Sequence, residues 1–218
     1  MAGVVVGFVV NGVVNRLAML LLARLNPQVT GITSDDGFIM GRFTFADTAS
    51  LVLVGTVIGV LGGLLFLSIR HLRFGPTWFR TASMTIGPAV VVGSMLVHTD
   101  GIDFHLLEPT WLAIALFLVL PGLFAYAVGL LVDRWTLDDA WPMRSRRIWI
   151  VGLVPVAALG PFAALVVAGL ILRGVRHEVP TVQNLLAQPA WANLVRLGFV
   201  AVFLLALRGL TADVTTLL

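Results

Sequence analysis

The stretch ASLVLVGTVIGVLGGLLFLSI, residues 49–69, decides the fold class because it has no charged side chain over a length that crosses a lipid bilayer. A transmembrane helix needs about 20 mostly apolar residues. Further runs of this kind lie at 3–25, 81–97, 111–132 and 148–172. A weaker run, 191–207, is interrupted by Arg196, so it either spans with that arginine reaching the interface or lies tilted there. We therefore predict an all-α integral membrane protein with a bundle of five to six transmembrane helices.

The composition agrees with a single transmembrane helical domain over residues 1–218. Hydrophobic residues make up 59% of the chain and charged residues 11%, and the mean hydropathy is +1.01. No polar stretch is long enough for a separate soluble domain, which needs about 50 residues. The chain has no cysteine, which excludes disulfides, thiolate metal sites and cysteine nucleophiles.

The few charged residues predict the topology. The connections 26–48 and 98–110 are acidic, whereas 70–80 and 133–147 are rich in arginine. Because cytoplasmic loops of membrane proteins carry an excess of positive charge, we place the amino terminus inside and the two acidic loops outside. Arg173 and Arg176 in the fifth connection would then lie outside, against the rule.

The basic residues do not indicate a nucleic-acid partner. All 14 are arginine, and the formal net charge is only +3. The pI near 10.9 therefore reflects the absence of lysine more than a strongly basic surface.

The first acidic connection contains a hairpin signal. Asp36-Gly37 stands between Ile32-Thr33 and the partly alternating residues 38–45. An Asp-Gly pair between such runs favours a two-residue turn. We predict a small extracytoplasmic β-hairpin between the first two helices, lying over their outer ends as a cap or lid.

The first predicted helix has a small, polar face. Gly3, Gly7, Asn11 and Asn15 recur every four residues and so share one side of the helix. One interpretation is a packing seam in which the amides form hydrogen bonds across the contact. The other is that Asn11 and Asn15, together with Arg16, line a path for a polar solute.

Arg16 lies roughly 12 Å from Arg24 along a helix that rises about 1.5 Å per residue, which places it inside the hydrocarbon layer. An ionisable group at that depth costs at least about 2.5 kcal/mol and usually faces a partner, a cavity or a substrate path. Asp47 and Glu108 are candidate charge partners, since both lie toward the outer surface that Arg16 approaches. Such a pair is structural as easily as functional, and the alternative is an arginine that reaches the outer headgroups.

The second predicted helix carries the strongest packing signal. Gly55, Gly59 and Gly63 form two overlapping small-xxx-small steps. We favour a tight internal contact with the small face of the first helix over homodimerisation.

The third connection is dense in oxygen and imidazole ligands. Its candidate metal ligands are His98, Asp100, Asp103, His105 and Glu108. These ligand types suit zinc or another divalent ion, although their spacing matches no metal signature. The alternatives are a solvated acidic loop, a surface that attracts cations, or carboxylates that clamp arginines. The sequence has no catalytic template such as His-Glu-x-x-His, Gly-x-Ser-x-Gly or a P-loop.

Several short motifs in the first 135 residues carry a family resemblance. They are Asn15-Arg16, Leu25-Asn26-Pro27, Gly31, Thr33, Gly37 and Gly41-Arg42-Phe43-Thr44, followed by the glycine-stepped second helix. In these motifs the chain resembles a family of uncharacterised bacterial polytopic membrane proteins. The resemblance implies a bacterial inner-membrane location and a shared topology, and it implies no activity, cofactor or site residue.

Three functions fit these observations. The first is a small permeation or transport protein, with Asn11, Asn15 and Arg16 lining a path for an ion or for an anionic or polar solute. The alternative is a non-catalytic accessory or assembly subunit of a homo-oligomer or larger membrane complex, in which the glycine face and the arginine loops contact partners. The third is a membrane enzyme that uses a divalent metal at residues 98–108.

Overall fold

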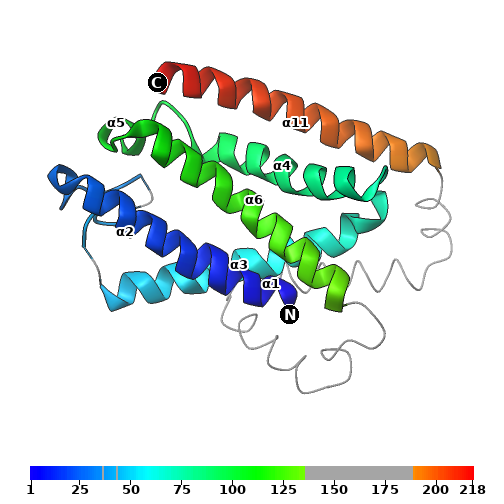
Figure 1. Cartoon of the computed structure of the whole chain (residues 1–218), viewed down its shortest axis with the longest axis horizontal. Coiled ribbons are helices and arrows are strands. Elements are labelled where there is room, and N and C mark those ends of the chain that lie inside the picture. Colours follow the sequence, from blue (N-terminus) through cyan, green and yellow to red (C-terminus); the bar gives the residue numbers. More distant parts are fainter. Residues whose placement is uncertain (36, 43, 136–188) are drawn as a thin grey trace.

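The computed structural model describes residues 1–35, 37–42, 44–135 and 189–218. Within these residues the chain forms helices and short connections and no strand (Figure 1). It starts with one continuous helix made of α1 (Ala2–Val6), the π-helical η1 (Gly7–Val14) and α2 (Asn15–Leu25). The other elements are η2 (Pro27–Val29), α3 (Phe45–Ile69), η3 (Arg70–Leu72), α4 (Thr77–Leu96), α5 (Asp103–Leu106), α6 (Thr110–Trp135) and α11 (Pro189–Leu217).

Four of the described helices are long and apolar enough to cross a membrane. They are Ala2–Leu25, Phe45–Ile69, Thr110–Trp135 and Ala190–Leu217. This supports the membrane helical class, but the predicted number of five to six spans is not confirmed. The run 81–97 does form a helix, α4, yet its first turns carry polar side chains such as Arg80 and Thr81, and it is not among the four. The span predicted at 148–172 lies outside the described residues.

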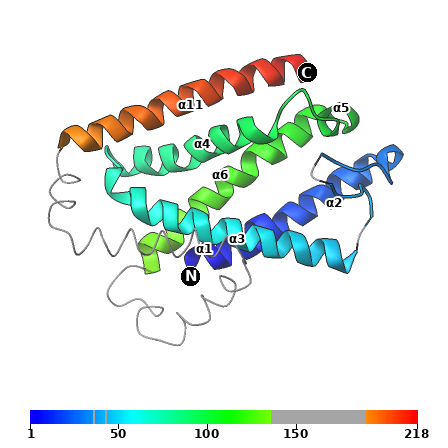
Figure 2. The same cartoon turned by 180° about the vertical axis from the view of Figure 1, so that it is seen from behind.

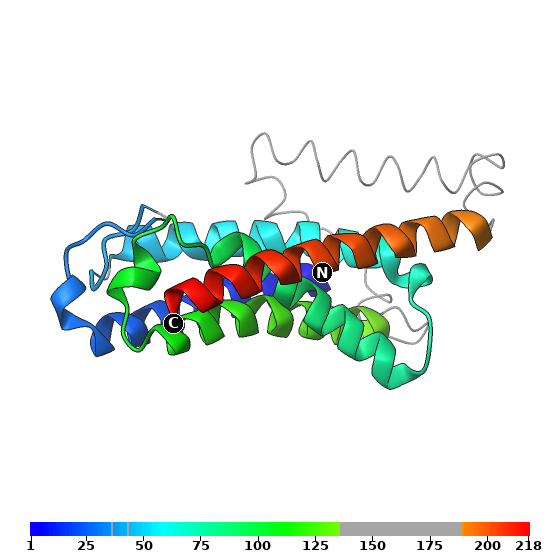
Figure 3. The same ribbon diagram turned by 90° about the horizontal axis from the view of Figure 1, so that it is seen from above.

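The helices run lengthwise beside one another between two ends of the bundle (Figure 3). At one end lie the described residues of the connection that follows α2 (26–35, 37–42 and 44), residues 97–109 and the last turn of α11, and we call this the loop end. At the other end lie residues 70–76, Trp135 and the first turns of α11, and we call this the arginine end. Figures 1 and 2 show the two ends from opposite sides, with the amino terminus nearer the arginine end. The two acidic connections thus share one end, as the charge pattern predicts.

The direction of α11 differs from the expectation. If each predicted apolar run crosses the membrane once, residues 173–190 are expected at the opposite end of the bundle from residues 70–80. In the structure, the Nε atom of Arg196 donates a hydrogen bond to the main-chain oxygen of Leu72 at 3.0 Å, so α11 begins at the arginine end. Leu210 and Leu217 then pack at the loop end, in the cluster that contains Val97. Because a long-range contact sets this direction, the count of apolar runs could not reveal it.

The first helix and α3 meet at their glycines. A Cβ atom added to Gly7 would lie 2.6 Å from the main-chain oxygen of Gly55 and 2.7 Å from the Cα of Gly59. One added to Gly63 would lie 3.1 Å from the Cα of Gly3. The two backbones are therefore in direct contact, which only glycine allows at these positions. We call this contact the glycine seam.

The connection between the first helix and α3 reverses direction without forming strands. Thr33 and Ile39 make an isolated antiparallel bridge, and the N–H of Met40 donates to the oxygen of Ile32 at 2.8 Å. The predicted β-hairpin is not confirmed within the described residues. Gly31, Gly37 and Gly41 all have positive φ, between 73° and 92°. Because these three residues adopt left-handed backbone conformations within eleven positions, the chain turns too often for more than an isolated β-bridge to form.

Candidate functional site

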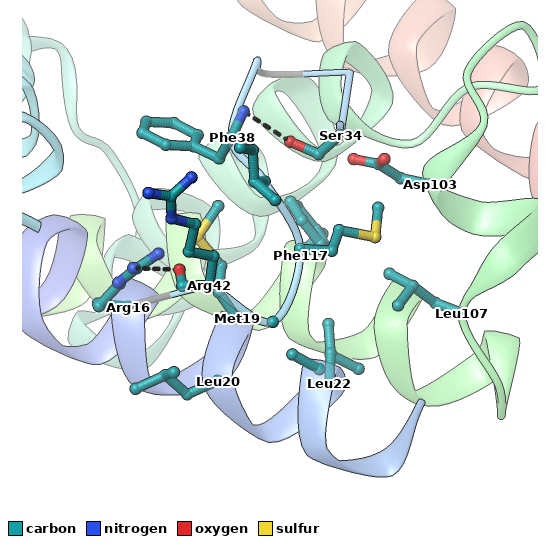
Figure 4. A pocket seen from close by; sticks show the side chains of 14 residues that line it. Arg16, Met19, Leu20, Leu22, Ser34, Phe38, Arg42, Asp103, Leu107 and Phe117 are labelled. Atoms are coloured by element: carbon teal, nitrogen blue, oxygen red, sulfur yellow. Dashed lines mark hydrogen bonds between the residues drawn. The ribbon is translucent and has the colours of Figure 1, made fainter. Parts of the chain in front are cut away.

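Arg16 lies on α2, and its side chain is covered by the first connection near the loop end. The residue is only 7% exposed, and its Nη2 atom donates a hydrogen bond to the main-chain oxygen of Arg42 at 3.3 Å (Figure 4). The connection therefore folds back over the helix and supplies an acceptor to the charged group. Burial of a guanidinium is costly unless such acceptors surround it.

A cavity of about 60 Å³ lies beside Arg16. Its walls come from α2, the first connection, α5 with the residue after it, and α6. The lining residues are Arg16, Met19, Leu20, Leu22, Ala23, Ser34, Phe38, Ile39, Met40, Gly41, Arg42, Asp103, Leu107 and Phe117. Since a water needs roughly 10–15 Å³ of such space, the cavity is large enough for a few waters or a small ion. A larger hollow of about 490 Å³ at Leu25, Glu108, Pro109 and Thr110 is an open depression of the surface nearby.

The charged groups divide the cavity into two sides. Figure 4 shows Arg16 and Arg42 on one side, and Asp103 with Ser34 on the other. The remaining walls are mostly apolar. Guanidinium groups present a planar fork of donors that matches the oxygens of a carboxylate or phosphate. The arginine side is therefore chemically suited to a small oxyanion, and the apolar walls weaken the competition from water.

Two sets of hydrogen bonds hold the acidic connections together over this cavity. Asn26 is fully buried, its Nδ2 atom donates to the oxygen of Glu108, and its Oδ1 atom accepts from the N–H of Glu108, both at 2.8 Å. The carboxylate of Asp35 accepts from the N–H groups of Ile102 and Asp103, each at 3.2 Å. The N–H of Asp35 in turn donates to Oδ1 of Asp103 at 3.2 Å. These bonds fix the first connection above the helix ends.

Sequence reasoning did not single out Asn26, Asp35 or Arg42 as site residues. Asn26 and Arg42 occur only within the motifs of the family resemblance, and Asp35 lies in the connection 26–48 that the sequence marks as acidic. The signal that was available is an amide directly after an apolar span and before a proline. Such an amide is well placed to accept and donate across neighbouring connections.

The two asparagines of the first helix do not line the cavity. Asn11 lies at the glycine seam, where its Nδ2 atom is 3.5 Å from the main-chain oxygen of Gly55. Asn15 is half-buried at the start of α2. Of the three residues predicted to line a path, the structure places Arg16 at the cavity and Asn11 in the contact with α3.

Asp47 and Glu108, the predicted charge partners of Arg16, form main-chain hydrogen bonds to other residues. Asp47 lies in the first turn of α3, and its N–H donates to Oγ1 of the capping residue Thr44 at 3.1 Å. Glu108 is exposed and meets Asn26 through its main chain. The pairing of Arg16 with either carboxylate stays a prediction.

The candidate metal ligands are not gathered into one cluster. Among the described residues there is no group of three or more His, Cys, Asp or Glu side chains arranged to hold a metal ion. The Nε2 atom of His105 is 3.1 Å from the oxygen of Thr99, and Asp103 is bound to the first connection. Asp100 and Glu108 are exposed.

Comparisons with known proteins add no further assignment. No family model, no curated protein and no solved structure matches this chain.

Proposed function

We propose that the protein is a small transport protein of the bacterial inner membrane that takes up a small oxyanion at the loop end. The observation that carries the proposal is the burial of Arg16 beside a cavity that a second arginine, Arg42, also lines. A buried charge within a predicted membrane span is expensive, and such groups commonly mark solute paths. The positive-inside rule supports an orientation with the loop end outside.

In this proposal the residues have different roles from those first expected. Arg16 and Arg42 bind the anion, and Ser34 offers a hydroxyl on the opposite side of the cavity. Asn11 stabilises the glycine seam, because it is engaged with α3. The solute path therefore leaves the cavity away from the seam, where the backbones touch.

The test is anion flux into proteoliposomes that contain the purified full-length protein. Acetate and inorganic phosphate serve as probes, because they represent a carboxylate and a phosphate of small size. The variant Arg16→Gln should reduce flux at least tenfold, since it removes a charge-assisted donor worth more than about 1.4 kcal/mol. The matched control is Arg24→Gln, which changes an exposed arginine near the end of the same helix and should leave flux unchanged.

Two outcomes would overturn this function. One is wild-type flux no higher than that of empty liposomes for either anion. The other is equal flux in Arg16→Gln and wild type, with both proteins folded by circular dichroism and size-exclusion chromatography.

A role as an accessory subunit is the second candidate, and α11 favours it. Part of α11 is apolar enough to span a membrane, and no residue in that part is buried against the described residues. Its side chains Leu197, Val200 and Leu204 are at least half exposed. A partner helix could cover this surface as lipid does. Purification in mild detergent should then recover a second protein in constant ratio, and a homogeneous monomer would contradict this role.

A further inference from the structure

Two arginines at the arginine end are oriented by the same short connection. The Nε atom of Arg80, on α4, donates to the main-chain oxygen of Gly75 at 2.8 Å. The Nε atom of Arg196, on α11, donates to the main-chain oxygen of Leu72 at 3.0 Å. Helices far apart in sequence therefore direct their guanidinium groups toward residues 72–75.

The ends of these two guanidinium groups remain available within the part of the chain that the structure describes. Arg80 uses only its Nε atom, and Arg196 uses Nε together with Nη1, which donates to Oδ1 of Asn193 at 2.9 Å. Arg73 differs, because both of its Nη atoms bind the carboxylate of Asp133 at 2.9 Å. The charge of Arg73 is thus paired, whereas no described carboxylate forms an ion pair with Arg80 or Arg196.

Aromatic side chains lie at the same end of the bundle, and one of them contacts Arg196. The guanidinium of Arg196 lies 5.0 Å from the ring centre of Phe74, which packs against Phe79 with ring centres 5.4 Å apart. Trp78 is 71% exposed and Trp191 is 46% exposed. Exposed tryptophans at the end of a membrane helix are typical of the headgroup layer. Exposed tryptophans at this end indicate that the guanidinium groups lie near the depth of lipid phosphates.

We infer that Arg80 and Arg196 form a binding site for the phosphate of an anionic phospholipid headgroup. Arginine donor forks match phosphate oxygens, and arginines near the surface are attracted to anionic leaflets. The charge of this end supports the choice, because its described residues include one carboxylate, Asp133, and several arginines, namely Arg70, Arg73, Arg80, Arg134 and Arg196. The inference is independent of the proposed transport of anions, which concerns the opposite end.

The experiment is lipid binding to the purified full chain, followed by native mass spectrometry. Phosphatidylglycerol and phosphatidylcholine are added at equal concentration, and the ratio of the two bound lipids is measured. The wild type should prefer phosphatidylglycerol, and each arginine changed to glutamine should lower the preference about fivefold. The variants are Arg80→Gln, Arg196→Gln and the double variant. The matched control is Arg208→Gln, an exposed arginine further along α11, which should keep the full preference.

Arg80→Gln keeps the test decisive if the double variant does not fold, because the Arg80 side chain is exposed and donates one hydrogen bond, to Gly75, among the described residues. An unchanged preference in a folded Arg80→Gln or double variant would overturn the site. An equal loss of preference in Arg208→Gln would show that lipid binding depends only on general charge attraction. That result would overturn the site as well. Inorganic phosphate is added as a competitor. Its displacement of the lipid at millimolar concentration would identify a free phosphate site and contradict the lipid assignment.

Discussion

Asn26 and Glu108 join the two connections of the loop end through a reciprocal pair of hydrogen bonds, both 2.8 Å long. The same amide nitrogen of Asn26 also donates to the oxygen of Leu22 at 2.9 Å. One buried side chain thus links the end of α2 to the residues that precede α6. The cavity beside Arg16 lies beneath the connections that this link holds.

Asn26→Ala should therefore lower stability markedly. The change removes both hydrogen bonds to the main chain of Glu108 at a contact where Asn26 itself is fully buried, at a cost of about 1–3 kcal/mol. We expect the thermal unfolding midpoint in detergent to fall by several degrees. Gln28→Ala is the control, because Gln28 is exposed and donates to the same oxygen of Asn26. Equal midpoints for the two variants would contradict a structural role for Asn26.

Gly7→Val should separate the first helix from α3. A Cβ at Gly7 would overlap the backbone of Gly55 and Gly59, which cannot move aside as a flexible side chain can. Such overpacking costs typically about 1–3 kcal/mol, measured as a lower unfolding midpoint. The control is Gly87→Val on α4, where an added Cβ meets nothing within 4 Å. A similar loss in both variants would show that helix propensity, and not the seam, determines the effect.

Single cysteines should reveal the direction of α11. The natural chain has no cysteine, so an introduced thiol is the sole target for a membrane-impermeant maleimide. Thr77→Cys and Ala190→Cys should be labelled from the same side of the membrane, because Arg196 binds the oxygen of Leu72. Gln28→Cys, at the loop end, should be labelled from the opposite side. Labelling of positions 28 and 190 from one common side would refute the observed direction.

The membrane class and the contents of the two ends could be predicted from local sequence. Apolar length predicts the helices at 3–25, 49–69 and 111–132, because each must satisfy its own backbone hydrogen bonds in lipid. The clustering of acidic residues in two connections correctly predicts that these connections share one end. The span predicted at 81–97 is a helix in the structure, but Arg80 and the polar residues after it lower the apolar character of α4, which is not among the four candidate spans.

The sequence by itself determined that the chain has apolar helices long enough to span a membrane, because hydrophobic length and the cost of exposed backbone in lipid are local properties. It also marked Arg16, Gly55, Gly59 and Gly63 as residues that need an explanation. Only the tertiary structure decided what each one touches. Arg16 meets the oxygen of Arg42 across 26 positions of sequence, and α11 is aligned by a contact between Arg196 and Leu72 across 124. Such contacts depend on how separate segments pack, and neither periodicity nor charge counting encodes that packing.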